Sequence, residues 1–183
     1  MDYKIIAWNY ALALMCQGRT HSELVYVTCA VKGMALSWLG AWFCRGRLAQ
    51  TWSTRTELKK MLLFGFILDT SFYWFHRLLH LKQLYRFHKL HHAATHPCPR
   101  DGIVASWLEI FLTGTVPFFG ALWLTRLHYR VYLWLLAIGL PFVLIAHTSF
   151  DTEHLLHHKN QQHNFGNTRI WDVVCGTRVK SKP

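Results

Sequence analysis

The stretch that decides the fold is HRLLHLKQLYRFHKLHH, which runs from His76 to His92 and holds five histidines. Its second half has the spacing H-x-x-H-H, and the same spacing returns in residues 154–158, shortly after His147. On a helix, residues three and four apart share a face, and adjacent residues diverge by about 100°. One H-x-x-H-H run on a helix can therefore supply imidazole ligands to two neighbouring metal ions. The pattern predicts a two-metal site.

Long apolar blocks flank these histidines and predict helices in a membrane. Hydrophobic residues make up 52% of the 183 residues, with nine Trp and twelve Phe, which is rich for a soluble protein. They gather at residues 5–16, 25–43, 61–75, 103–124 and 132–146. A spanning helix needs about 20 mostly apolar residues, and a somewhat shorter one is tolerated. We therefore expect an all-α integral membrane bundle with about four spanning helices.

The last two apolar segments predict where the histidines meet. Residues 103–124 and 131–147 are joined by the short polar turn TRLHYR at 125–130, as expected for antiparallel neighbours. Such a hairpin leaves one face of the membrane and returns to it. The histidines at 76–92 and 147–158 should therefore lie together, at one membrane face.

The net charge of +11 does not point to nucleic acid. The basic residues lie in the links between apolar blocks, where Lys and Arg normally meet lipid head groups.

We expect three parts: N-terminal membrane helices and a linker at 1–60, a histidine-bearing domain at 61–177, and a basic tail at 178–183.

Other uses of histidine fit the pattern less well. Scattered surface histidines would not repeat one spacing beside apolar blocks, and a structural zinc site needs four ligands that are usually rich in cysteine. A zinc peptidase needs Glu directly after the first histidine of H-E-x-x-H, whereas Arg77 follows His76. A membrane bis-histidine haem takes its ligands from within spans rather than from clusters at their ends. Imidazole itself suits Zn, Cu, Fe and Ni.

Residues around the histidines also match a family pattern. They include D-T-x-x-Y-x-x-H at 69–76, H-T-S-F-D at 147–151, and H-x-x-H-H with N-F-G, W-D and G-T at 154–177. Over residues 61–177 the chain resembles the fatty acid hydroxylase superfamily, which includes sterol desaturases and 4-methyl-sterol oxidases. The H-T-S-F-D run is similar to the H-S-G-Y-D run of the sterol oxidase branch.

The resemblance implies a membrane-bound non-haem di-iron oxygenase. Such an enzyme uses O2 to hydroxylate or desaturate a C–H bond of a lipid, here a sterol or a fatty acyl lipid, with its metal site on the cytosolic side. The membrane would be the endoplasmic reticulum in a eukaryote and the cytoplasmic membrane in a bacterium. Two iron ions are implied, which zinc can replace in a recombinant preparation. The ligands carried over are His76, His80, His88, His91, His92, His147, His154, His157 and His158.

Four further residues are candidates near the metals. Asp69 shares a helical face with His76 and either orients an imidazole or is an ordinary surface carboxylate. The additional candidates are His163, His96 and Asp151. One departure stands out, because many relatives carry H-P-x-E after the second histidine motif, and Ser106 occupies the histidine position here.

Electrons must come from outside this sequence, which has no G-x-G-x-x-G fingerprint and no flavin-like or haem-binding segment. The resemblance implies a separate carrier such as cytochrome b5 or a ferredoxin, fed by NAD(P)H. Two alternatives stay open at this point. One is a membrane acyl-lipid desaturase, and the other is a catalytically degenerate relative that binds metal or lipid, which the loss of the histidine at Ser106 favours.

Overall fold

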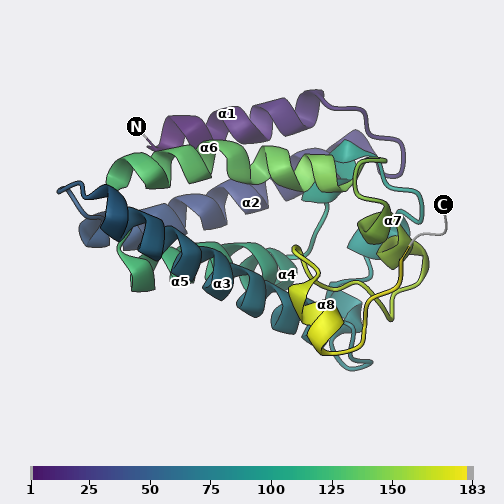
Figure 1. The fold of residues 1–183 in the computed structure, drawn as a ribbon. Coiled ribbons are helices and arrows are strands. Elements are labelled where there is room, and N and C mark those ends of the chain that lie inside the picture. Colours follow the sequence, from purple (N-terminus) through teal and green to yellow (C-terminus); the bar gives the residue numbers. More distant parts are fainter. Residues whose placement is uncertain (1, 181–183) are drawn as a thin grey trace.

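The computed structural model describes residues 2–180, and these form an all-helical bundle without a β-sheet, as the sequence predicts (Figure 1). A single isolated bridge joins Ala49 and His128. The α-helices are α1 (Asp2–Met15), α2 (Glu23–Cys44), α3 (Thr54–Leu79), α4 (Trp107–Glu109), α5 (Val116–Thr125), α6 (Tyr129–Ala146), α7 (Thr152–Lys159) and α8 (Ile170–Val174). Residues 181–183 of the expected basic tail lie outside the described residues.

Three helical stretches among the described residues are long and apolar enough to cross a membrane. They are Glu23–Arg47, Trp107–Thr125 and Tyr129–Ala146. The fourth expected segment, 61–75, lies inside α3, a helix of 26 residues whose first turns carry Arg55, Glu57, Lys59 and Lys60. The chain therefore has the predicted membrane bundle, with three spans that qualify by length and composition.

The predicted hairpin is formed by Trp107–Thr125 and α6. Its turn contains Arg126 in the left-handed region (φ 51°). The buried carboxylate of Glu57 on α3 accepts from the backbone N–H of His128 at 2.8 Å, and Lys60 donates to the carbonyl of Arg126 at 2.9 Å. These bonds fix the turn to the start of α3, at the end of the bundle opposite α7 (Figure 1).

The first arm of the hairpin begins later than the apolar block. Residues 99–103 form a 3-10 turn, and the helix starts at Trp107, after Ser106 caps it by accepting from the backbone N–H of Glu109. Residues Ile110–Thr115 then form a π-helical turn, in which the N–H of Val116 bonds to the carbonyl of Phe111, five residues back. Such turns are rare in proteins overall, and those that occur are often found at functional sites.

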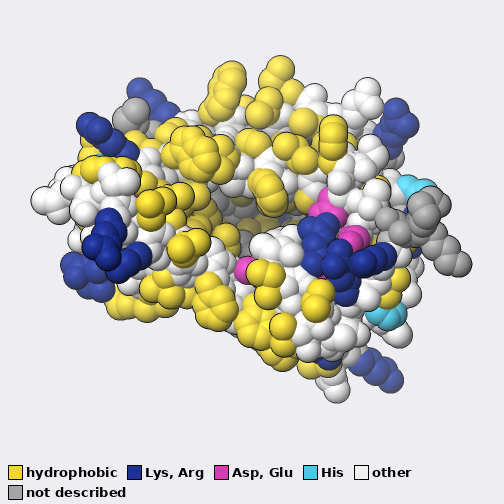
Figure 2. Space-filling model, in the orientation of Figure 1, with side chains coloured by type: hydrophobic (Ala, Val, Ile, Leu, Met, Phe, Trp, Pro, Cys, Tyr) yellow, Lys and Arg dark blue, Asp and Glu magenta, His cyan; other side chains and the backbone are white. Residues whose placement is uncertain are grey.

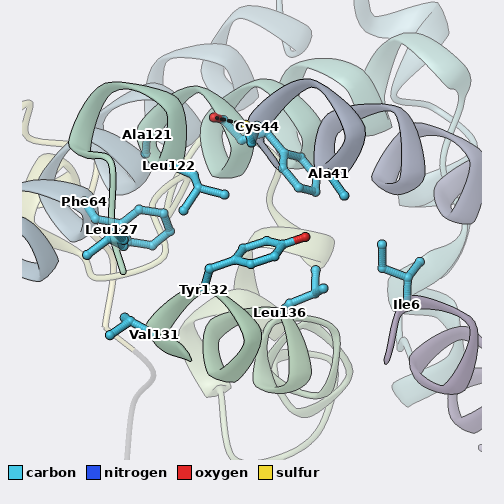
Figure 3. Close-up of a cluster of buried hydrophobic side chains, with 11 residues drawn as sticks. Ile6, Ala41, Cys44, Phe64, Ala121, Leu122, Leu127, Val131, Tyr132 and Leu136 are labelled. Atoms are coloured by element: carbon cyan, nitrogen blue, oxygen red, sulfur yellow. Dashed lines mark hydrogen bonds between the residues drawn. The ribbon is translucent and has the colours of Figure 1, made fainter. Parts of the chain in front are cut away.

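Buried apolar side chains from five helices hold the bundle together. Figure 3 shows Tyr132 and Leu136 of α6 facing Leu122 of α5, with Ile6 and Ala41 beside them. In lipid the hydrophobic effect does not drive helices together, so close packing and polar contacts carry the association. One such contact is the bond from the Cys44 thiol to the carbonyl of Phe119, at 3.3 Å.

Hydrophobic side chains also cover much of the outer surface in Figure 2. Exposed examples are Trp134 and Phe142 on α6 and Phe66 on α3. A soluble protein rarely exposes apolar patches of this extent, whereas a lipid-facing surface requires them. At one end of the bundle, α7, α8 and the intervening loops gather beyond the ends of α3 and α6 (Figure 1).

Candidate metal centre

The histidines come from three differently built segments. His76 lies in the last turn of α3, and His80 caps that helix. His154, His157 and His158 lie on α7, which agrees with the helical reading of their spacing. The middle motif is different: it is built from the 3-10 turns Tyr85–Phe87 and His91–Ala93 rather than from an α-helix. The helical expectation for this motif is wrong, although His91 and His92 still diverge.

The nine predicted histidines assemble into two neighbouring groups. We call them the five-histidine group (His76, His80, His88, His92 and His157) and the four-histidine group (His91, His147, His154 and His158). Within each group, the ring nitrogens that could hold a metal all lie within 4.8 Å of one another. Each H-x-x-H-H motif sends members to both groups, as the divergence of its last two histidines predicts.

Backbone carbonyls orient the rings of both groups. Nδ1 of His76 lies 2.7 Å from the carbonyl of Phe165, and Nδ1 of His157 lies 2.6 Å from that of His163. The same arrangement pairs His91 with Val104, His147 with Val143, and His158 with Ala94, at 3.1, 2.8 and 2.9 Å. Since a carbonyl only accepts, Nδ1 of each neutral ring carries the hydrogen and Nε2 carries a lone pair. The lone pair of Nε2 is the one a metal uses.

These Nε2 atoms face one another at short range. Nε2 of His91 and of His147 are 3.4 Å apart, and both rings donate through Nδ1 to a carbonyl. Two lone pairs at this distance repel each other and cannot form a hydrogen bond. In the five-histidine group, Nε2 of His157 lies 3.1 Å from Nε2 of His92. A cation placed among the nitrogens turns this repulsion into coordination, so the residues present fit a metal in each group.

Burial keeps the rings neutral, as metal ligands must be. Desolvation lowers the pKa of His158 to about 3, and it lowers the pKa values of His154 and His157 well below their usual range, with a smaller contribution from neighbouring imidazoles. His157 and His158 are both completely buried. A protonated cluster is therefore disfavoured at neutral pH.

A carboxylate that the sequence reading did not include lies beside both groups. Glu109 is buried, and its Oε1 is 2.8 Å from Nδ1 of His88 and 3.9 Å from Nδ1 of His91. The first pair is close but not aligned for a straight hydrogen bond, and Glu109 Oε2 has no partner among the described residues. Glu109 is the only acidic residue in the apolar block 103–124, and it stands three residues after Ser106, at the Glu position of the H-P-x-E run; these were the signals available in the sequence.

The closing segment of the chain supports the five-histidine group from behind. The buried carboxylate of Asp172 accepts from the backbone N–H groups of Phe165 and Gly166, both at 2.8 Å, and its backbone carbonyl accepts from the N–H of Thr177 at 2.8 Å. Its Oδ1 also accepts from the Thr177 hydroxyl at 2.8 Å. Phe165 in turn presents its carbonyl to His76. The W-D and G-T pairs of the family pattern thus shape the loop that orients one histidine.

The remaining candidates contribute indirectly. Both oxygens of Asp69 accept from Thr168, at 3.1 and 2.6 Å, so among the described residues its partner is the closing loop rather than an imidazole. Asp151 caps α7 by accepting from the N–H of His154 and pairs with Arg169. His163 offers its carbonyl, not its ring, to His157. His96 is exposed and belongs to neither group.

An apolar cavity opens beside the histidines. Its part next to the metal centre has a volume of about 190 Å³ and is lined by His76, His88, His91, His147, His154 and Glu109. A second cavity, of about 330 Å³, lies between the helices of the bundle, and Tyr10 and Phe72 line both cavities. Sites of this type, apolar with a few convergent polar groups, are where small ligands bind.

The fatty acid hydroxylase family model matches residues 61–177. The C-4 methylsterol oxidase erg25 of Schizosaccharomyces pombe is 31% identical over 140 residues, covering 64% of this chain and 46% of the relative. Methylsterol monooxygenase 1 of Rattus norvegicus is 30% identical over 129 residues, covering 61% and 44%.

The chain thus spans less than half the length of each of these relatives. No solved structure matches it. The family model covers the three histidine motifs and the closing loop, which are the segments that build the two groups. The chain therefore belongs to the fatty acid hydroxylase family, and within that family it resembles the sterol oxidase branch.

Proposed function

We propose that this chain is a membrane-bound oxidoreductase that oxidises a C–H bond of a lipid, either a sterol or a fatty acyl lipid, with O2. The observation that carries the proposal is the pairing of two all-imidazole groups at the end of an apolar cavity. The relatives named above, a methylsterol oxidase and a methylsterol monooxygenase, make a sterol the first substrate to test. Hydroxylation and desaturation are both within the chemistry proposed.

Each histidine group would hold one iron ion. Bound iron would supply the redox chemistry that O2 activation needs, which zinc does not have. The chain itself orients the imidazole rings. Backbone carbonyls fix the Nδ1 atoms of five rings, so that the Nε2 lone pairs converge without rearrangement. The apolar wall of the cavity would exclude water and hold a lipid C–H bond beside His91, His147 and His154, which line it.

Electrons would come from a separate carrier, such as cytochrome b5 or a ferredoxin reduced by NAD(P)H. The exposed basic side chains of Lys82, Arg86 and Lys89 lie on the segment that carries His88, and they suit an acidic carrier. We also propose that the metal centre lies on the cytosolic side of the endoplasmic reticulum membrane, or of the cytoplasmic membrane in a bacterium.

The test begins with the metal content. Protein purified in detergent should hold about two metal ions per chain, one for each histidine group. Iron-loaded protein with a reductase, a carrier and a methylsterol should consume O2, and mass spectrometry should find a product heavier by one oxygen or lighter by two hydrogens. A heavier product identifies a hydroxylase, and a lighter one identifies a desaturase.

Variants make the test specific. His91→Ala and His157→Ala each remove a ligand from one group and should abolish turnover while the protein stays in the membrane fraction. His96→Ala is the matched control, because His96 is exposed and outside both groups. Full activity in either ligand variant, or turnover by a zinc-only protein, would refute the oxygenase. Two bound metals with no turnover of any lipid would favour the degenerate relative.

A further inference from the structure

One loop supplies two of the carbonyls that orient the four-histidine group. We call residues 94–104 the bridging loop. At its start, the carbonyl of Ala94 lies 2.9 Å from Nδ1 of His158. At its end, the carbonyl of Val104 lies 3.1 Å from Nδ1 of His91. The carbonyls that hold rings of the five-histidine group come instead from the segment after α7. The bridging loop therefore orients one group and not the other.

A third ring of the four-histidine group packs against the middle of the bridging loop. Gly102 lies so close to His147 that a Cβ atom added there would be 2.8 Å from Nδ1 of the ring. Real Cβ atoms essentially never come this close, so the loop needs a glycine at this point. Nδ1 of His147 already pairs with the carbonyl of Val143 at 2.8 Å, and the ring cannot turn away without losing that bond. A shift of the bridging loop thus reaches three of the four rings.

A buried carboxylate, that of Asp101, fixes the shape of the bridging loop. Its side chain is completely buried, and its Oδ2 accepts from the backbone N–H and the thiol of Cys98, at 2.9 and 3.0 Å. The backbone carbonyl of Asp101 accepts from the N–H of Val104 at 3.0 Å. These bonds close the 3-10 turn and place Val104, whose carbonyl orients His91.

The N-terminal part of the chain supplies further donors to Asp101. Tyr26 on α2 is completely buried, and its hydroxyl donates to Oδ1 of Asp101 at 2.6 Å. Thr20, in the loop between α1 and α2, donates to Oδ2 at 3.1 Å. This loop lies at the same end of the bundle as α7 (Figure 1). Hydrogen bonds to an ionised carboxylate are about twice as strong as neutral ones. Asp101 is therefore a strong link between the bridging loop and a part of the chain that precedes the family match.

A neighbouring contact braces this link. The buried guanidinium of Arg100 donates to Glu23 on α2 at 2.8 Å, and its Cζ lies 4.4 Å from the centre of the Tyr26 ring. Gly18 leaves room for both side chains, because a Cβ there would be 2.6 Å from the Tyr26 ring and 2.7 Å from Arg100. Shape and charge thus both hold α2 against the bridging loop.

We propose that Asp101 and Tyr26 are positioning residues for the four-histidine group, which they hold in its metal-binding arrangement through the bridging loop. The metal centre is then not complete within residues 61–177, because one of its two sites depends on the N-terminal helices. The inference rests on the proposed function only in that each group holds a metal ion. The placement of the rings does not depend on it.

The first test reads the rings without any metal. Diethyl pyrocarbonate modifies accessible imidazoles, and peptide mass spectrometry gives the rate at each histidine of chelator-treated protein in detergent. Asp101→Asn places an amide N–H against donors that need an acceptor. It should raise the rates at His91 and His147 about tenfold and leave the rate at His76 unchanged, because only the bridging loop loosens. Tyr26→Phe removes one hydroxyl and should give a smaller change at the same two rings.

Glu57→Gln is the matched control for this test. Glu57 is also a buried carboxylate that accepts from a backbone N–H and a side chain, but it lies at the opposite end of the bundle. Its substitution should leave all three rates unchanged. Equal rises at His76 and His147 in Asp101→Asn would show a general loss of stability and would overturn the proposal, as would unchanged rates. If Asp101→Asn does not fold, Tyr26→Phe decides by the same criterion.

The second test reads the two metal sites. Wild-type protein titrated with cobalt(II) should bind two ions per chain. Asp101→Asn should weaken one of the two binding steps about 10- to 100-fold, as for other groups that support a ligand, and leave the other step unchanged. Adding Tyr26→Phe to Asp101→Asn should cause no further loss, because both changes break the same link. Equal weakening of both steps would contradict a role confined to the four-histidine group.

The outcomes separate this inference from the proposed function. Wild-type protein that binds two cobalt ions but oxidises no lipid in its iron-loaded form contradicts only the proposed function. Wild-type protein that oxidises lipid, with equal rates at His147 in Asp101→Asn and Glu57→Gln, contradicts only the positioning role. The ring reactivities decide that role even if the chain binds fewer than two metal ions.

Discussion

The two histidine groups differ in how they meet the cavity and the backbone. In the four-histidine group, His91, His147 and His154 line the cavity beside the metal centre, whereas in the five-histidine group only His76 and His88 do. Backbone carbonyls hold three rings of the smaller group but two of the larger one. The smaller group therefore combines a stiffer frame with fewer ligands, which leaves more coordination positions open toward substrate. The larger group is more enclosed.

The largest expected effect is a loss of folding stability at low pH, to which both histidine groups contribute. Burial lowers the pKa of His158 in one group to about 3 and that of His80 in the other to about 2. In the unfolded chain these rings titrate near pH 6.5, so the unfolded state binds more protons below that value. The metal-free protein should therefore be most stable above about pH 6.5 and should lose stability steadily as the pH falls toward 3.

Thermal unfolding of chelator-treated protein, recorded from pH 8 to pH 4 in detergent, measures this loss. The melting temperature should be nearly constant above about pH 7 and fall below about pH 6.5. A flat profile down to pH 4 would show that the metal-free rings are already exposed to water, and the two groups would then not be preformed.

Removing single ligands should separate the groups. His154→Ala leaves three histidines in the smaller group, while His80→Ala leaves four in the larger one. We expect His154→Ala to lower turnover by at least about 100-fold and to release one metal, and His80→Ala to have the smaller effect on metal content. Metal analysis of the two purified variants, next to His96→Ala, checks the order. The reverse order would place the open coordination positions at the five-histidine group.

Glu109 should affect the larger group more than the smaller one, because its Oε1 is closer to His88 than to His91. Glu109→Gln keeps the size of the side chain and replaces one of the two carboxyl oxygens beside His88 by an amide nitrogen. We expect metal affinity in the five-histidine group to fall about 10- to 100-fold, as for other groups that support a metal ligand. Competition with a chromophoric chelator measures it. His96→Ala, which removes an exposed ring outside both groups, is the control, and equal affinity in both variants would exclude this role.

Substitution of Asp172 should have the smallest effect, which is a modest loss of folding stability. Asp172→Asn replaces one acceptor oxygen by an amide that cannot accept from the N–H groups of Phe165 or Gly166. Leaving a buried donor without a partner costs about 1–3 kcal/mol, which a lower melting temperature in detergent would report. The five-histidine group should loosen through the Phe165–His76 contact, with the four-histidine group unaffected. Equal metal loss from both groups would contradict this path.

The sequence predicts those parts of the site that depend on spacing alone. The motif at His154, His157 and His158 forms a helix as expected, and the hairpin brings it to the segment that ends at His92. The middle motif has the same spacing but no helix, because the chain must turn between α3 and Pro97 and is held by 3-10 turns. Spacing does not distinguish these cases, since both geometries send the last two histidines in different directions.

Contacts between distant segments explain what the sequence did not predict. Asp69 shares a helical face with His76, which suggested a role beside an imidazole, but Thr168 lies ninety-nine residues away in sequence and takes both of its oxygens. Glu109 is an isolated acidic residue within the apolar block 103–124. Its position beside His88 depends on how the helix from Trp107 is rotated, and no local pattern in the sequence gives that rotation.

The π-helical turn at Ile110–Thr115 sets this rotation. An α-helix advances by about 100° per residue, so one extra residue in a turn rephases everything that follows it. Before the turn, Glu109 faces the histidines, and after it, Phe119 and Leu122 of α5 face the buried cluster. Deleting one residue of the turn would restore regular α-helical winding. The helix would then lose either the contact of Glu109 with the metal centre or the packing of α5 in the buried cluster. The turn thus lets the two ends of one helix meet different requirements. One end presents a carboxyl group to the metal centre, and the other end presents apolar side chains to the core.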